Sequence, residues 1–137
     1  MRVEYLHEGS PNCPLLRFYG NNLLDFSTLG RCFKELGSGT LQHVGIHDLP
    51  GFEAIGRCTL TARVGQKNKG VSQVGPGQDF EWVLTREGWE TVGELTEPFL
   101  ELRKVHMHQW FAGKDAKFGL EDSRISILLS NSEAGQW

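Results

Sequence analysis

The clearest pattern in the chain is an alternation of apolar and polar residues between positions 58 and 64. Its apolar positions are Cys58, Leu60, Ala62 and Val64, and arginine or threonine stands between them. Because successive side chains of a β-strand point to opposite faces, a period of two predicts a strand with one buried and one solvent-facing side. A second alternation, in which Phe80, Trp82 and Leu84 are apolar, predicts another strand over 79–84.

After position 84 the pattern changes to a helical period. Trp89, Val92 and Leu95 fall on one side of a helix, and three glutamates fall on the opposite side. Those glutamates are Glu87, Glu90 and Glu94. Thr85 precedes the pattern as an N-cap, and Pro98 ends or kinks the helix near Glu97 because proline lacks a backbone N–H. We therefore predict an amphipathic helix over 86–97 whose apolar side packs on a sheet.

A shorter helix is predicted around 29–36. Its apolar residues are spaced i, i+3, i+4 and i+7, and they are Leu29, Cys32, Phe33 and Leu36. Asp25 or Ser27 is the expected N-cap and Gly37 the expected left-handed stop. Further strands are expected at 2–7, 14–19, 40–47, 105–111 and 125–129, and the glycine-rich segment 65–77 is expected to be a connecting loop.

Two helices among about six to seven strands predict an α+β fold. Connections of hairpin length favour a mostly antiparallel or mixed sheet with both helices packed on one face. The regular strand–helix alternation of a doubly wound sheet is missing. The length of 137 residues is typical of one domain, so we expect a single α+β domain over 1–137.

The charge of the chain is slightly acidic and unevenly distributed. The net charge is −3 and the pI is about 5.9, so we expect no nucleic-acid binding. No apolar run approaches the roughly 18 residues of a membrane span, and Met1 is followed by a mixed segment rather than by an apolar core, which favours a cytoplasmic protein with no membrane contact. The segment 81–104 holds six glutamates and three cationic residues, so its net charge equals that of the whole chain.

Cysteine and histidine spacing gives little support for a metal centre. Three cysteines without a C-x-x-C pair indicate reduced thiols. His106 and His108 face the same side of a strand, with Cα atoms about 6.6 Å apart, but two ligands do not complete a site. On a strand, His43 and His47 are about 13 Å apart, too far to share an ion. A third ligand would have to come from elsewhere: His7, His43 or Asp48. We expect no metal and no cofactor.

Known catalytic motifs are also missing from the sequence. Gly65 and Gly70 have the glycine spacing of a P-loop, but Val71 and Ser72 stand where lysine and serine or threonine are required. Residues 37–39 do not form the G-x-S-x-G turn of a serine hydrolase. The sequence leaves enzymatic activity open and favours a non-enzymatic role.

One hypothesis for the function follows from the charge distribution. A non-enzymatic interaction or regulatory domain would present Glu87, Glu90 and Glu94 to a basic protein partner. This hypothesis explains why the acidity is concentrated in one helix.

Two alternatives stay open at this point. A small-molecule-binding domain would have an aromatic pocket between the sheet and the second helix. Its expected lining residues are Trp82, Trp89, Trp110, His106 and His108. The less favoured alternative is a small metal-assisted enzyme built around His106 and His108. The oligomeric state does not follow from the sequence.

Overall fold

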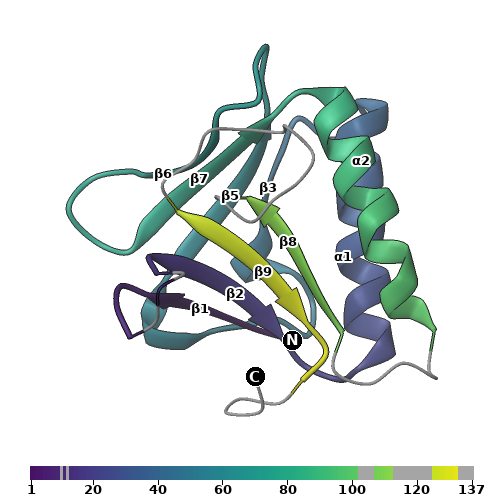
Figure 1. Cartoon of the computed structure of the whole chain (residues 1–137). Coiled ribbons are helices and arrows are strands. Elements are labelled where there is room, and N and C mark those ends of the chain that lie inside the picture. Colours follow the sequence, from purple (N-terminus) through teal and green to yellow (C-terminus); the bar gives the residue numbers. More distant parts are fainter. Residues whose placement is uncertain (10, 12, 102–106, 113–124, 133–137) are drawn as a thin grey trace.

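The computed structural model describes residues 1–9, 11, 13–101, 107–112 and 125–132 (Figure 1). Over these residues it contains two α-helices, three short 3-10 helices and nine strands in two mixed sheets. The α+β class is therefore confirmed. The strand number exceeds the predicted six to seven, and the strands form two sheets rather than one.

The first sheet has five strands in the order β4-β1-β2-β9-β8. The bounds are β1 (Arg2–Leu6), β2 (Leu15–Tyr19), β4 (Glu53–Ala54), β8 (His108–Ala112) and β9 (Ser126–Ser130). Strands β1 and β2 form the antiparallel hairpin that the sequence predicts. Strand β9 pairs in parallel with β2, and β8 pairs antiparallel with β9. The N-terminal hairpin therefore lies beside the C-terminal strands.

The second sheet has four strands in the order β3-β5-β7-β6. The bounds are β3 (His43–Gly45), β5 (Thr59–Val64), β6 (Gly70–Gln73) and β7 (Asp79–Leu84). The central strands β5 and β7 run parallel, and both edge strands are antiparallel to their neighbours. Leu60, Ala62, Phe80, Trp82 and Leu84 are all buried, which confirms both alternating patterns.

Two strand predictions need correction. The segment expected to be only a connecting loop contains β6, a short edge strand whose Ser72 and Gln73 are exposed, so no apolar alternation marks it. The strand expected over 40–47 is only three residues long, because the chain turns into a 3-10 helix over Ile46–Asp48. Ile46 is nevertheless fully buried. The predicted separation of His43 and His47 assumed an extended strand, and it does not apply because His47 lies in the 3-10 helix.

The first helix, α1 (Leu23–Ser38), is longer than predicted at both ends. Asn22 is its N-cap and accepts a hydrogen bond from the Leu24 backbone N–H at 2.9 Å. Gly39, with φ of 84°, provides the left-handed stop. The caps predicted at Asp25 or Ser27 and at Gly37 are thus wrong. The first turn begins with Leu23 and Leu24, which are exposed and therefore do not continue the row of buried apolar residues. Gly37 lies inside the helix rather than after its end.

The second helix, α2 (Arg86–Thr96), matches its sequence pattern closely. The Thr85 side chain accepts a hydrogen bond from the Gly88 backbone N–H, as expected of an N-cap. The α-helix ends at Thr96 and continues as a 3-10 turn over Glu97–Leu100 that contains Pro98. The predicted effect of this proline is confirmed.

Both helices lie side by side along one flank of the molecule (Figure 1). The apolar side of α2 contacts α1 as well as the second sheet. Trp89 is fully buried, with its ring centroid 5.7 Å from Phe33 of α1 and 4.7 Å from Trp82 of β7. Residues from both helices and both sheets join one hydrophobic cluster. Among the described residues, no helix has both the length and the apolar character needed to cross a lipid bilayer.

Candidate functional site

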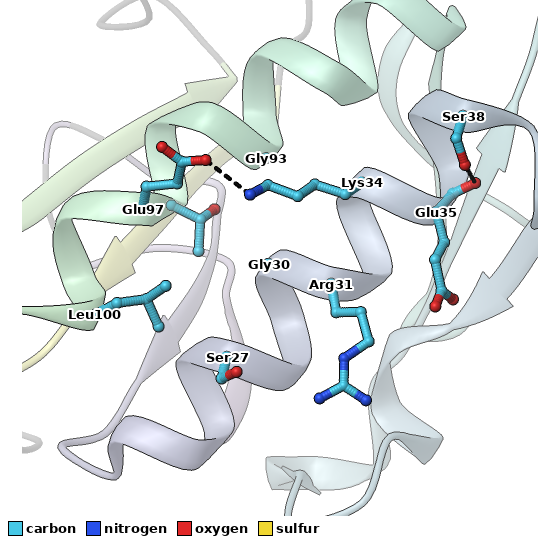
Figure 2. A pocket seen from close by; sticks show the side chains of 10 residues that line it. Ser27, Gly30, Arg31, Lys34, Glu35, Ser38, Gly93, Glu97 and Leu100 are labelled. Carbon is cyan, nitrogen blue, oxygen red and sulfur yellow. Dashed lines mark hydrogen bonds and ion pairs between the residues drawn. The ribbon is translucent and has the colours of Figure 1, made fainter.

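A groove runs along the outer side of the helix pair (Figure 2). We call it the interhelical groove, and its volume is about 400 Å³. Ser27, Arg31 and Lys34 line it from α1, and Glu97 and Leu100 line it from the turn that follows α2. It is open to solvent and also reaches Gly93 and Thr96 of α2.

Glycines explain why the helices approach closely and still leave a groove. A Cβ atom added to Gly93 of α2 would lie 3.1 Å from Cγ of Lys34, and one added to Gly30 of α1 would lie 3.5 Å from Cγ2 of Thr96. Gly30 and Gly93 both line the groove. Because neither residue has a side chain, the space above them stays empty, and at Gly93 the two helices also come into tight contact.

One ion pair crosses the groove. The Lys34 ammonium donates a hydrogen bond to Oε1 of Glu97 at 2.7 Å (Figure 2), and both side chains are about half exposed, at 54%. Exposed pairs of this kind stabilise a fold by at most about 1 kcal/mol. Arg31 points away from this pair and has no ion-pair partner among the described residues. The α1 wall therefore carries two cations and one carboxylate, Glu35, and faces the single carboxylate of Glu97 in the turn after α2.

Two of the three predicted acidic residues lie next to this groove, whereas Glu87 is exposed on α2 and lines neither hollow. Glu90 and Glu94 line a second depression of about 310 Å³, which shares Lys34, Ser38 and Glu97 with the interhelical groove. The exposed residues Glu87, Glu90 and Glu94 form what we call the acidic strip. Over the part of the chain that the structure describes, no cation forms an ion pair with any of the three.

Trp82 and Trp89 lie together, but inside the core. Both are fully buried, with ring centroids 4.7 Å apart in an edge arrangement. Phe33 and Phe111 pack against the same rings. Trp110 is partly exposed, whereas its neighbour Phe111 is fully buried. In this structure the two buried indoles fill space in the core rather than line an open pocket.

The histidines that the structure describes do not assemble into a metal site. His108 is exposed on β8, and His106 lies outside the described residues. His43 is exposed, whereas His47 is partly buried and its Nδ1 accepts the Leu60 backbone N–H at 3.0 Å. Within the described residues, no group of three or more histidine, cysteine or acidic side chains is placed to bind a metal ion.

The two buried thiols are poor nucleophiles. Burial, with a smaller contribution from the Glu35 carboxylate, raises the pKa of the Cys32 thiol to about 12. Burial also raises the pKa of the Cys58 thiol, whose Sγ contacts the Val3 carbonyl oxygen. The nucleophilic form of cysteine is the thiolate, so neither residue is chemically activated.

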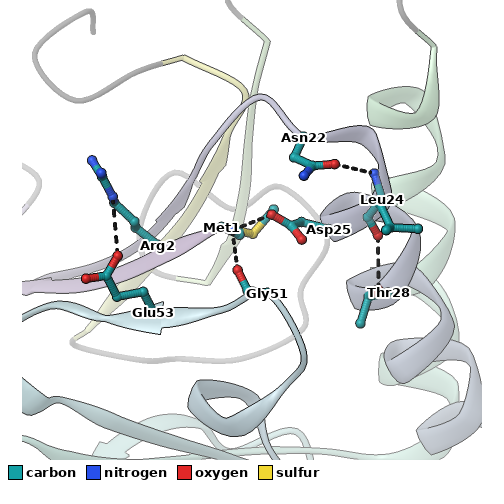
Figure 3. A network of polar contacts seen from close by, with 8 residues as sticks. All are labelled: Met1, Arg2, Asn22, Leu24, Asp25, Thr28, Gly51 and Glu53. Carbon is teal, nitrogen blue, oxygen red and sulfur yellow. Dashed lines mark hydrogen bonds and ion pairs between the residues drawn. The ribbon is translucent and has the colours of Figure 1, made fainter.

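A separate polar network anchors the start of α1 (Figure 3). The Met1 ammonium forms a buried ion pair with Asp25 and donates a hydrogen bond to the Gly51 carbonyl oxygen at 2.8 Å. Nearby, the exposed side chains of Arg2 and Glu53 are 3.8 Å apart. These contacts join β1, α1 and the turn before β4, which indicates a structural role.

Sequence reasoning located the acidic strip but missed the groove beside it. Arg31 and Lys34 were not singled out, and neither were the helical glycines. The glycines were the available signal, because a glycine inside an otherwise helical pattern often marks close packing. No protein-family model, curated protein or solved structure matches this chain, so its function is inferred from the surface itself.

Proposed function

We propose that this protein is a non-enzymatic interaction domain that binds a basic protein partner at the acidic strip and the adjoining interhelical groove. The observation that carries the proposal is the position of two exposed, unpaired carboxylates, Glu90 and Glu94, in a depression that adjoins an unfilled groove. A partner with lysine or arginine at its surface would find both charge and shape complementarity there.

The acidic strip has a cost in the free protein. Glu90 and Glu94 are four residues apart on one helix face, and like charges at this spacing repel each other by a few tenths of a kcal/mol. Exposed carboxylates also contribute little to the stability of the fold, because their side chains are solvated. A bound cationic surface would remove the repulsion and would accelerate association by long-range attraction.

A small-molecule site is the weaker alternative at this surface. The groove volume of about 400 Å³ falls within the range of roughly 300–1,000 Å³ that is typical of ligand pockets. However, the groove is open, and two of the three indoles expected to wall a pocket, Trp82 and Trp89, are in the core. A broad, charged and open surface fits a protein segment better than an enclosed ligand.

We also propose that the domain acts in the cytoplasm. Cys32 and Cys58 are free thiols, and both are buried. Reduced cysteines are typical of proteins in reducing compartments.

The test is affinity purification from native extract with the Glu90→Lys/Glu94→Lys variant beside the wild-type protein. A basic partner should be retained by the wild type at low salt and lost at high salt, because exposed charges are screened over about 8 Å at physiological ionic strength. The variant should not retain it. The matched control is Glu8→Lys/Glu53→Lys, which produces the same net charge at exposed positions outside the site. An identical set of retained proteins for both variants and the wild type would refute the proposal.

A further inference from the structure

We infer that the partner segment at this surface is an amphipathic helix that places an aliphatic side chain at Leu100 and two basic side chains at Glu94 and Glu90. This inference rests on the proposed function and specifies its partner. It follows from the division of the groove into two parts with different chemistry.

The apolar part lies at the end of the groove where α2 gives way to its 3-10 turn. Leu100 is 40% exposed there, and Ser27 and Gly30 of α1 form the opposite wall and floor. Large aliphatic side chains are normally buried, so an exposed leucine beside an empty groove is a contact point for another apolar group. Figure 2 shows Leu100 and Ser27 at this end, away from Glu35 and Ser38.

The acidic part lies at the other end. Glu90 and Glu94 line the depression there together with Gly37 and Ser38. The Lys34–Glu97 ion pair separates the two parts. Because both of its side chains are half exposed, a segment lying over the groove can pass across the pair or displace it at small cost.

The spacing of these contact points matches the repeat of a helix. Glu94 and Glu90 precede Leu100 by six and ten residues. At about 1.5 Å per residue up to Thr96 and about 2.0 Å per residue in the 3-10 turn that follows, this corresponds to roughly 11 Å and 17 Å along the chain. On a ligand helix, residues at i, i+7 and i+11 lie on one face at about 0, 10.5 and 16.5 Å. A third helix also fits naturally into the trough between two packed helices.

The two walls also set the orientation of this ligand helix about its own axis. Its basic side faces α2, because Glu90 and Glu94 lie there, whereas the α1 wall carries Arg31 and Lys34 beside a single carboxylate, Glu35. A helix that is basic all round would be repelled by Arg31. The structure therefore selects a ligand with basic residues on one flank and neutral or acidic residues on the other.

The test uses a synthetic alanine-based helical peptide with leucine at i and arginine at i+7 and i+11, carrying a fluorescent label. Binding to the full chain is measured by anisotropy at low salt. Two peptide controls replace leucine by serine or both arginines by glutamine. We expect the parent peptide to bind about tenfold more tightly than either control, a difference of about 1.4 kcal/mol in binding free energy.

Protein variants locate the peptide. Leu100→Ser and Ser27→Phe, which alter the apolar part, should each weaken binding of the parent peptide several-fold. Leu24→Ser and Thr28→Phe are matched controls on α1 whose side chains do not line the groove, and they should bind like the wild type. Thermal unfolding of all four variants checks that each is folded. Equal effects of the groove and control variants would overturn the inference.

The remaining outcomes separate this inference from the proposed function. If Glu90→Lys/Glu94→Lys abolishes binding while the leucine-free peptide binds as tightly as the parent, the acidic strip is a docking surface but the ligand is not an amphipathic helix. If no peptide binds, the inference fails, and the extract experiment alone decides the proposed function. If sedimentation shows a dimer of this chain that Leu100→Ser dissociates, the occupant is a second copy and the inference is wrong.

Discussion

Gly37 of α1 lies directly against the backbone of Glu90 in α2. A Cβ atom added to Gly37 would be 3.0 Å from the Glu90 backbone nitrogen and 3.2 Å from its Cα, and it would also lie 3.3 Å from the Arg86 carbonyl oxygen. All three neighbouring atoms belong to backbone that no rotamer change can move. This contact therefore sets the distance between the helices and the position of the acidic strip relative to the groove.

Gly37→Ala should destabilise the protein. Alanine gains up to about 1 kcal/mol over glycine in a helix interior, but forcing a methyl group into a closed backbone contact costs typically about 1–3 kcal/mol. We expect a net loss of roughly 1 kcal/mol in the free energy of unfolding, measured by urea denaturation. Gly30→Ala on the same helix is the matched control, because its Cβ would meet Thr96 at an ordinary 3.5 Å. Equal stability changes in the two variants would contradict this account of the helix contact.

Trp89→Ala should be among the most destabilising single changes in α2. The indole is fully buried, packs on Trp82 and Phe33, and donates its Nε1–H to the Arg63 carbonyl oxygen at 2.9 Å. Removal of a buried tryptophan costs about 3–5 kcal/mol through lost burial and the cavity it leaves. Glu87→Ala on the exposed side should change stability by less than about 0.5 kcal/mol in the same denaturation assay. A loss below about 1 kcal/mol for Trp89→Ala would show that α2 is wrongly oriented.

The Cys32 thiol should make stability fall at alkaline pH. Its pKa rises from 9.0 in the unfolded chain to about 12 in the fold, with burial as the main cause. Below pH 9 the thiol is neutral in both the folded and the unfolded chain, and its burial contributes fully to the free energy of unfolding. As the pH rises from 9 toward 12, the unfolded chain loses the thiol proton first, so this contribution is lost. Denaturation curves of the wild type and Cys32→Val, measured from neutral to alkaline pH, should therefore diverge above pH 9. Parallel pH profiles would exclude a contribution from this thiol.

Asp25→Asn should weaken the fold far more than an equivalent change at the surface. The Met1 ammonium and the Asp25 carboxylate are both largely buried, and removal of one partner of a buried ion pair typically costs about 3–5 kcal/mol. Glu53→Gln, which disrupts the exposed contact with Arg2 at 3.8 Å, should cost less than about 0.5 kcal/mol. Calorimetry of both variants gives the comparison, and similar melting temperatures would argue that the Met1–Asp25 contact is solvated.

Local patterns predicted the elements whose signal repeats within a few residues. The alternation around Leu60 and Phe80 marks β5 and β7 because strand side chains point to opposite faces. Thr85 and Pro98 mark the two ends of α2. The Thr85 side chain accepts a backbone N–H of the first turn, and Pro98 has no backbone N–H to donate, so both effects can be predicted from nearby residues alone. By contrast, β6 at Gly70–Gln73 is held by its pairing with β7, and its own residues do not alternate.

The sequence by itself determined that α2 has an acidic side, because the direction of each side chain follows from the helical repeat of 3.6 residues. What lies beside that side was decided by the tertiary structure. Lys34 and Glu97, which meet across the groove, are 63 residues apart in the chain. Gly30, Gly37 and Gly93 acquire their role only when the helices meet. A glycine has no side chain, so it adds no apolar or polar signal to the local sequence pattern. The groove therefore depends on a contact between distant segments, which no local pattern encodes.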